Sequence, residues 1–343
     1  MSADGGREES SAHGVSRLAP AAERSGGLDA VTFGEVMAMF IAEEAGPLER
    51  VSGWTLALAG AETNVAIGLA RLGHRVGWVG RVGDDPFGRY ALAELTAGGV
   101  DTSMIEVDPS ARTGFALKSR ADGGDPQVVY YRKDSAGSRL QATPRSDAFL
   151  ASAGHLHLTG IPLALSEHTR AFAFRAIDIA REVGATVSFD PNLRPALWAD
   201  REEMVEVIRA CAARADWILP GLSEATVLTG LTGAQDVASY YLDQGASMVV
   251  IKDGGRGATL HTRDGSWAHG VFPVTVVDTV GAGDGFATGV ISAMLDGRPP
   301  AEVLERGAAV GAFAVTSSGD KDGLPDRAQL EAFLAASRTP SAG

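Results

Sequence analysis

The residues best suited to chemistry lie in a short run of small side chains near the C-terminus, Gly281-Ala282-Gly283-Asp284. Small residues let an anion approach the backbone, and the free N–H groups of a first helical turn bind phosphate oxygens with help from the helix dipole. Asp284 places a carboxylate inside this electropositive turn, where it is suited to accept the proton of a hydroxyl that attacks a phosphate. The alternative is a simple helix cap beside a tight turn, and four residues alone do not decide between the two.

The segments on either side of this turn are predicted to be a strand over residues 274–277 and a helix over residues 284–295. The turn is not a Walker A loop, because the chain has no Gly-x4-Gly-Lys-Ser/Thr. It is not a dinucleotide fingerprint either, because the third glycine is missing and the turn lies far from the first strand. A nicotinamide oxidoreductase is therefore disfavoured.

Strand-like and helix-like segments alternate from about residue 30 onward. Strands are predicted over residues 30–39, 75–80, 186–190, 217–219 and 248–252. Helices are predicted over residues 62–72, 86–98 and 201–214, with Asp200 and Glu203 as a capping box for the last, and others begin near residues 283, 301 and 327. This alternation predicts an α/β fold whose parallel sheet is covered by helices on both faces.

Two stretches interrupt the alternation, residues 40–58 and residues 113–132, which contain strand-like runs with no helix between them. We interpret them as a small β-sheet lid on the main body, because phosphoryl transfer needs water to be excluded from the site. The alternative is that they are ordinary edge strands of the main sheet.

Composition narrows the class of protein. A net charge of −13 argues against a nucleic-acid partner. No apolar run approaches the ~20 residues of a membrane span. The single cysteine, Cys211, cannot form an intramolecular disulfide, which predicts a cytoplasmic location, and we expect its thiol to be buried and inert. Residues 1–28 read as a disordered tail, 29–336 as one domain and 337–343 as a loose end.

The C-terminal turn, extended to residues 278–284, resembles the C-terminal signature of the PfkB (ribokinase-like) carbohydrate kinase family. Residues 59–66 and 80–88 resemble its N-terminal signature, and the resemblance covers about residues 30–334. It implies a ribokinase-like three-layer α/β/α body with a β-lid that often forms a homodimer interface, higher assembly being left open. It also implies ATP and Mg²⁺, leaves a K⁺ requirement open, and makes Asp284 the base and the N–H groups of Gly281, Ala282 and Gly283 an anion hole.

The same resemblance assigns a nucleotide side. Gly254, Gly255 and Gly257 match the family's glycine turn near the nucleotide, an unliganded hairpin turn being the alternative. Glu224 matches an acid that organises Mg²⁺ through water, so no direct metal ligand is expected, and Gly221 stands where the family has Asn. Thr279, within the C-terminal signature, is also assigned to the nucleotide. Apart from the resemblance, Lys252 is a candidate for contact with phosphate, and a solvated strand-end lysine is the alternative.

On the substrate side the chain resembles the 2-keto-3-deoxygluconate kinases most closely. The implied substrate-binding residues are Gly34, Gly60, Asn64, Tyr90, Tyr130, Arg132, Arg194 and Asp320. A sugar acid brings a carboxylate, which guanidinium groups bind with paired hydrogen bonds, so Arg132 and Arg194 are the candidates. If both face solvent, a neutral sugar such as fructose fits better.

The prediction is therefore an ATP-dependent kinase for a small sugar acid. The alternatives are a fructokinase, a 5-keto-2-deoxygluconate kinase, or a non-catalytic sugar-binding regulator on the same fold. His155 and His157 alternate on one predicted strand, and we interpret them as strand residues because no third metal ligand is near.

Overall fold

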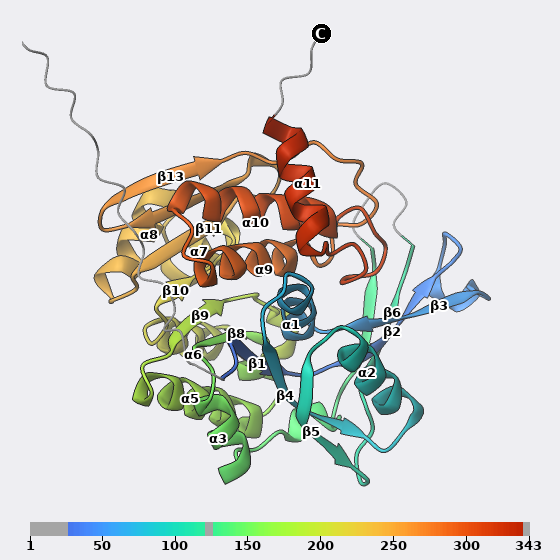
Figure 1. Cartoon of the computed structure of the whole chain (residues 1–343). Helices are drawn as coiled ribbons and strands as arrows, with labels where there is room; N and C mark the ends of the chain where they lie inside the picture. The colour runs from blue at the N-terminus through green and yellow to red at the C-terminus, as the bar shows by residue number, and fades with distance from the viewer. Residues whose placement is uncertain (1–26, 121–125, 339–343) are drawn as a thin grey trace, which may run out of the picture.

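A nine-stranded sheet forms the centre of the molecule in this computed structural model, which describes residues 27–120 and 126–338 (Figure 1). The strands lie in the order β13-β12-β11-β10-β9-β8-β1-β4-β5. From β5 to β11 neighbouring strands are parallel, and β12 and β13 are antiparallel additions. Their bounds are β1 (Ala30–Gly34), β4 (Val76–Gly83), β5 (Asp101–Asp108), β8 (His155–Thr159), β9 (Thr186–Asp190), β10 (Trp217–Ile218), β11 (Met248–Lys252), β12 (Ala258–Thr262) and β13 (Gly265–His269).

Helices cover both faces of this sheet, which confirms the predicted three-layer α/β/α body. One face packs on α3 (Pro144–Ala151), α4 (Ile161–Leu165), α5 (Glu167–Glu182), α6 (Arg201–Ala212), α7 (Leu222–Thr229) and α8 (Ala234–Asp243). The other packs on α1 (Ala61–Arg71), α2 (Pro86–Ala97), α9 (Ala282–Leu295) and α10 (Pro300–Ala314), with α11 (Arg327–Arg338) against α10. Strand residues alternate between the two cores, as Val249 and Val250 do in β11.

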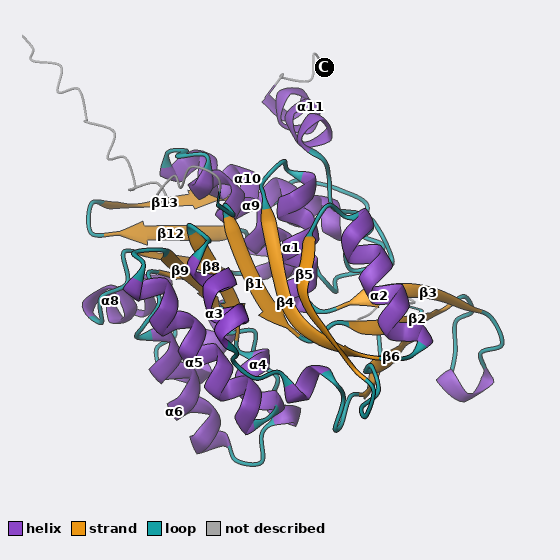
Figure 2. Cartoon of the chain, turned by 60° about the horizontal axis from the view of Figure 1, so that its bottom comes forward, coloured by secondary structure: helices purple, strands orange, loops and turns teal. Residues whose placement is uncertain are grey.

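A separate four-stranded sheet, the lid sheet, projects from one edge of the body (Figure 2). It consists of β2 (Met37–Ala42), β3 (Trp54–Ala59), β6 (Phe115–Lys118) and β7 (Val128–Tyr131) in the order β3-β2-β6-β7. The two interrupting stretches therefore form their own sheet and are not edge strands of the main one. The single strand predicted over residues 30–39 is two strands, because the chain leaves the body at Glu35 and Val36 and enters the lid sheet at Met37.

The strand predicted over residues 274–277 was wrong. Val276 and Val277 are 58% and 50% exposed, and the segment has no regular secondary structure. It is held by one backbone hydrogen bond from the N–H of Val277 to the carbonyl of Val315, at 2.8 Å. A run of β-branched residues favours a strand only where a neighbouring strand is present to pair with it.

The other boundaries agree with prediction to within a few residues. Asp200 caps α6 by accepting from the N–H of Glu203 at 3.2 Å, whereas the Glu203 carboxylate binds Arg170 instead of completing a capping box. Four short 3₁₀ segments connect the larger elements, η1 (Leu48–Arg50), η2 (Gly137–Arg139), η3 (Pro195–Leu197) and η4 (Gly254–Arg256).

Cys211 is buried on α6, and burial raises the pKa of its thiol, as expected of an inert cysteine.

Most of the predicted tail, residues 1–26, and residues 339–343 of the predicted loose end lie outside the described residues. At the described ends, the carbonyl of Leu28 accepts from the N–H of Gly154 at 3.0 Å, and α11 continues through Arg338. No helix within residues 27–120 and 126–338 combines the length and apolar character that a membrane span needs.

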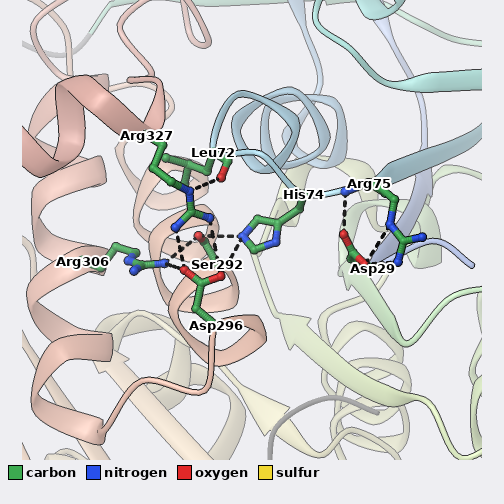
Figure 3. A network of polar contacts seen from close by, with 8 residues as sticks. All are labelled: Asp29, Leu72, His74, Arg75, Ser292, Asp296, Arg306 and Arg327. Atoms are coloured by element: carbon green, nitrogen blue, oxygen red, sulfur yellow. Dashed lines mark hydrogen bonds and ion pairs between the residues drawn. The ribbon is translucent and has the colours of Figure 1, made fainter. Parts of the chain in front are cut away.

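The far end of α9 is held by a partly buried polar network (Figure 3). The C-cap residue Asp296 accepts from Arg306 at 2.6 Å and from Arg327 at 2.8 Å, which joins α9 to α10 and α11. His74, which follows α1, hydrogen bonds Ser292 at 2.9 Å. Burial raises the pKa of Asp296, but the bonds from the two arginines outweigh it and leave that pKa below its usual range. The network fixes the direction of α9, whose first turn is the glycine-rich turn identified above.

Candidate active site

Two cavities meet at the first turn of α9. The lid cavity, about 370 Å³, lies between the lid sheet and the carboxyl ends of the parallel strands, and Met39 and Tyr130 are among its lining residues. The glycine-loop cavity, about 1130 Å³, lies beside η4 and the exposed segment before α9. Lys252, Thr279 and Gly283 line both. A crevice at the carboxyl ends of parallel strands is where α/β proteins generally bind ligands.

The turn itself requires glycine at position 281. Gly281 is the N-cap of α9 with φ +83°, a left-handed conformation, and an added Cβ would lie 2.7 Å from the carbonyl oxygen of Asp320. The N–H of Ala282 already donates to Thr279 at 3.3 Å. The N–H groups of Gly281, Gly283 and Asp284 find no acceptor within the described part of the chain. Three amides therefore remain free to bind an anion at the mouth of the lid cavity.

Asp284 lies in the first turn of α9 and lines the lid cavity. Its Oδ2 accepts a hydrogen bond of 2.8 Å from the Nδ2 of Asn64, on α1. Burial raises the pKa of Asp284 to about 6, the Asn64 bond acts against this, and the nearby carboxylates of Asp190 and Asp320 add to it. A carboxyl group with such a pKa, facing a cavity, is suited to exchange a proton near neutral pH.

Both predicted arginines line the lid cavity, so the condition for preferring a neutral sugar is not met. Arg132 follows β7, and its Nη2 and Nε lie 2.5 and 2.7 Å from Oε2 of the buried Glu35. Its guanidinium also lies 5.6 Å from the centroid of the Tyr130 ring. Arg194 is exposed, donates only to the neighbouring carbonyl of Leu193 at 3.0 Å, and has no carboxylate partner among the described residues.

A buried ion pair between Lys252 and Asp190 lies where the two cavities meet. Nζ of Lys252, at the end of β11, lies 2.5 Å from Oδ2 of Asp190, at the end of β9. Burial lowers the pKa of Lys252, but the carboxylates of Asp190 and Glu224 outweigh it and raise that pKa above its usual value. Lys252 is therefore a fixed, protonated cation beside the free amides, and not a solvated strand-end residue.

Glu224 lies in the first turn of α7 with both carboxylate oxygens occupied. Oε1 accepts from the N–H of Leu193 at 2.7 Å, and Oε2 accepts from the N–H of Gly221 at 2.8 Å. The described residues contain no cluster of His, Cys, Asp and Glu that could hold a metal ion. Mg²⁺ commonly binds phosphate oxygens and water with few protein ligands, so this acid fits contact through water.

The predicted glycine turn, Gly254, Gly255 and Gly257, lines the glycine-loop cavity next to Lys252. Gly257 has φ +95°, and a Cβ there would lie 2.1 Å from the carbonyl oxygen of His269. No side chain therefore fits at this position, and the backbone forms the cavity wall itself. Among the predicted substrate residues, Gly60, Asn64, Tyr130 and Asp320 all line the lid cavity.

Two predicted substrate residues lie outside the lining of the lid cavity. Tyr90, on α2, donates to the carbonyl of Leu56 at 3.4 Å. Gly34 ends β1, where an added Cβ would lie 2.6 Å from Oε2 of Glu62.

His155 and His157 both hydrogen bond Ser188 on β9, and burial lowers the pKa of each. The interpretation of these histidines as strand residues agrees with this arrangement.

Sequence reasoning missed four charged residues around the site. Glu35 and Asp190 each lie at the carboxyl end of a buried strand, a position that marks ligand sites in parallel sheets. Glu62 lines the lid cavity and hydrogen bonds Thr159, and burial raises its pKa to about 7. Lys118, on β6, lies on the same inner face of the lid sheet as Ala116, and no local sequence signal distinguished it from a solvent-facing lysine.

The family profile of the pfkB family carbohydrate kinases matches residues 28–327. The chain is 50% identical to a 2-dehydro-3-deoxygluconokinase of Bacillus subtilis (strain 168), over 91% of this chain and 97% of the relative. It is 33% identical to a 5-dehydro-2-deoxygluconokinase of Geobacillus kaustophilus, over 86% and 90%. The chain therefore belongs to the pfkB family, and it is a carbohydrate kinase.

Solved structures agree with this assignment. A PfkB protein from Polaromonas sp. JS666 is 48% identical with a TM-score of 0.82, covering 89% of this chain and 99% of its own. A putative ribokinase II from E. coli in complex with ATP and Mg²⁺ is 28% identical with a TM-score of 0.84, covering 90% and 99%. A fructokinase double mutant from Vibrio cholerae O395, with fructose, ADP and a potassium ion bound, is 28% identical with a TM-score of 0.77, covering 91% and 100%.

Proposed function

We propose that this kinase transfers the γ-phosphoryl group of ATP to the terminal primary hydroxyl of 2-keto-3-deoxygluconate, giving 2-keto-3-deoxy-6-phosphogluconate and ADP. The observation that carries the proposal is the meeting of two cavities at Lys252, Thr279 and Gly283, with Asp284 lining the smaller one. A nucleotide in the glycine-loop cavity would point its phosphates at a hydroxyl held in the lid cavity. The likeness to the Bacillus subtilis enzyme supports the substrate.

In the proposed reaction Asp284 takes the proton of the sugar hydroxyl as its oxygen attacks the γ-phosphorus. The bond between that phosphorus and the β-phosphate oxygen breaks, and ADP leaves. The free N–H groups of Gly281, Gly283 and Asp284 and the ammonium of Lys252 stabilise negative charge on the transferred group. Asn64 holds the Asp284 carboxylate toward the cavity.

The cofactor we propose is Mg²⁺, which when bound neutralises phosphate charge. The residue that would hold its water shell is Glu224, because its oxygens are already fixed by two backbone N–H groups and cannot turn to coordinate a metal without breaking them. Gly254, Gly255 and Gly257 offer bare backbone to the nucleotide.

The carboxylate of a sugar acid would bind the two arginines that line the lid cavity. Arg132 is locked by Glu35 and presents its remaining N–H groups in a fixed direction. Arg194 is exposed, and its guanidinium forms no ion pair with a carboxylate of the described residues. Because Arg194 has no competing carboxylate in the described chain, we assign it the larger share of acid recognition.

The test measures ADP release with ATP and Mg²⁺ across three substrates, 2-keto-3-deoxygluconate, 5-keto-2-deoxygluconate and fructose. We expect kcat/KM to be highest for 2-keto-3-deoxygluconate. Arg194→Ala should raise its KM at least about tenfold and leave the KM for ATP unchanged. A fructose preference in the wild type, unaffected by Arg194→Ala, would assign the chain to the fructokinases instead. No ADP release with any sugar would favour a non-catalytic regulator.

We also propose a homodimer through the lid sheet. The face of the lid sheet turned away from the lid cavity exposes Leu56 and Tyr131, at 39% and 50%, and Tyr131 stacks on Phe115 at 4.6 Å. Tyr131→Asp should halve the mass measured by light scattering, and a wild-type monomer would refute the dimer.

We also propose a cytoplasmic location, because the one cysteine of the chain is buried and unpaired. Cell fractionation tests this proposal.

A further inference from the structure

Lys118 is a buried cation that the proposed reaction does not use. It ends β6 on the inner face of the lid sheet, and its side chain is 1% exposed. Its Nζ lies 2.6 Å from Oδ2 of Asp278, 2.9 Å from Oδ1 of Asp320 and 3.2 Å from the carbonyl oxygen of Ser318. An ammonium has three N–H donors, and three oxygens surround this one.

Both residues whose carboxylates bind Lys118 also contact the anion-binding turn, Asp278 through its side chain and Asp320 through its backbone. Oδ1 of Asp278 accepts from the N–H of Val280 at 2.9 Å, which fixes the backbone immediately before Gly281. The carbonyl of Asp320 packs so closely on Gly281 that a Cβ there would lie 2.7 Å from it. The Lys118 ammonium therefore holds together the two sides of the loop that present the free amides.

Charge makes this ammonium necessary. Without Lys118, the buried carboxylates of Asp278 and Asp320 would repel each other and the incoming phosphates, and each would lose its cationic partner. Removing one partner from a buried ion pair is costly because the remaining charge is stranded in a low-dielectric site. Asp320 also lines the lid cavity and raises the pKa of Asp284, so its charge is felt at the proposed base.

Lys118 also joins the lid sheet to the body. β6 pairs with β2 and β7, which supply Met37, Met39, Val128 and Tyr130 to the wall of the lid cavity. The ion pairs of Lys118 with Asp278 and Asp320 thus hold the end of β6 against the loop that forms the anion-binding turn.

We propose that Lys118 is a positioning residue for phosphoryl transfer, whose ammonium fills the place that a monovalent cation would otherwise take between Asp278, Asp320 and the Ser318 carbonyl. Carboxylate and carbonyl oxygens are also the ligands of potassium and ammonium ions, and Lys118 saturates them from within the chain. Turnover is therefore independent of added monovalent cations. This inference rests on the proposed role of the Gly281 turn as the anion site.

The test compares wild type, Lys118→Ala, Lys118→Arg and the control Lys133→Ala, an exposed lysine just beyond β7. Each is assayed for ADP release with tetramethylammonium as the only monovalent cation and again with potassium or ammonium chloride. Wild type and Lys133→Ala should respond less than twofold. Lys118→Ala should lose on the order of 100-fold in kcat, with smaller changes in both KM values, and regain at least about tenfold with ammonium or potassium. Lys118→Arg, which keeps the charge, should retain more turnover than Lys118→Ala.

Three outcomes would overturn the proposal. Turnover of Lys118→Ala within threefold of wild type would show that the ammonium is not needed. A loss that neither ammonium nor potassium relieves, in a variant whose thermal unfolding midpoint is unchanged, would remove the cation argument. A wild type that needs potassium for activity would refute the proposal without any variant, even if Lys118→Ala fails to fold. A wild type with no kinase activity on any sugar is a separate result, because it would overturn the proposed function on which this inference rests.

Discussion

Asn64 donates a hydrogen bond of 2.8 Å from its Nδ2 to Oδ2 of Asp284, joining the first helix to the ninth across 220 positions of sequence. A hydrogen bond to a carboxylate favours the charged form and lowers its pKa. Burial acts in the opposite direction, and the balance leaves the pKa of Asp284 at about 6. The proposed base is therefore mostly ionised at neutral pH and can accept a proton there.

This balance predicts the acid limb of the pH profile. The kcat/KM of the wild type should rise with pH through a midpoint near 6, because protonated Asp284 cannot accept the substrate proton. Asn64→Leu removes the bond that lowers this pKa, so the midpoint should move upward by about 1 pH unit. The measurement is kcat/KM for the sugar over the range from about pH 5 to about pH 9. A midpoint that stays in place or moves downward would contradict this account.

Asp284→Asn should keep both substrates bound but lose turnover. An amide cannot accept the hydroxyl proton, and positioned proton transfer contributes about 10²–10⁴-fold to the rate of an enzyme. We expect kcat to fall by that amount while the KM values change little, and calorimetric titration with ATP should confirm binding. Near-normal turnover would refute the assignment of Asp284 as the base.

Gly281→Ala tests the anion-binding turn, with Gly230→Ala as a matched control. Both glycines are left-handed, with φ +83° and +78°, but an added Cβ meets the Asp320 carbonyl at 2.7 Å only at position 281. Both variants should lose about 1–2 kcal/mol of unfolding free energy. Only Gly281→Ala should also lose on the order of 100-fold in kcat, because the free amides shift. Equal kcat values for the two variants would remove the turn from the mechanism.

Asp296→Ala should destabilise the protein by about 2–4 kcal/mol, because it leaves Arg306 and Arg327 without their shared carboxylate. Glu302→Ala, which removes only an exposed pair with Arg298, should cost less than about 0.5 kcal/mol. Chemical denaturation at pH 7 measures both, and equal effects would deny the network a structural role.

The same carboxylate has a depressed pKa, so its stabilisation is present above its unfolded pKa of 3.8 and is lost as the pH falls through the lower folded value. The difference between wild type and Asp296→Ala should therefore narrow only below about pH 4.

Local patterns in the sequence were enough to predict much of the body. Asp200 marks the start of α6, and β9 and β11 have the bounds expected from their apolar runs, because burial between two helical layers leaves a continuous hydrophobic signal. The run Val274–Val277 shows the limit of such patterns. Its residues favour a strand, yet strand formation depends on a pairing partner that no local pattern reveals.

The candidate site divides in the same way. The tight turn at Gly281 and the position of Asp284 in the first turn of α9 were predictable, because four adjacent residues carry the pattern, whereas the chemical role of Asp284 stays a prediction. The Arg132–Glu35 pair and the Lys118 cluster were not predictable, because their members are far apart in the sequence. Arg132 and Glu35 are separated by 97 positions, and Lys118 and Asp320 by 202. A charged residue in a lid strand has the same local sequence pattern whether it faces solvent or a buried carboxylate.

The buried thiol of Cys211 has a practical consequence. The native chain has this one cysteine, and burial raises the pKa of its thiol, so a maleimide dye has no reactive target on the folded protein. A cysteine introduced at an exposed position of the lid sheet, with a second on the body, would accept a fluorophore pair without first deleting a natural residue. Single-molecule energy transfer would then report the distance between the lid sheet and the body, with and without substrate, in an otherwise unaltered chain.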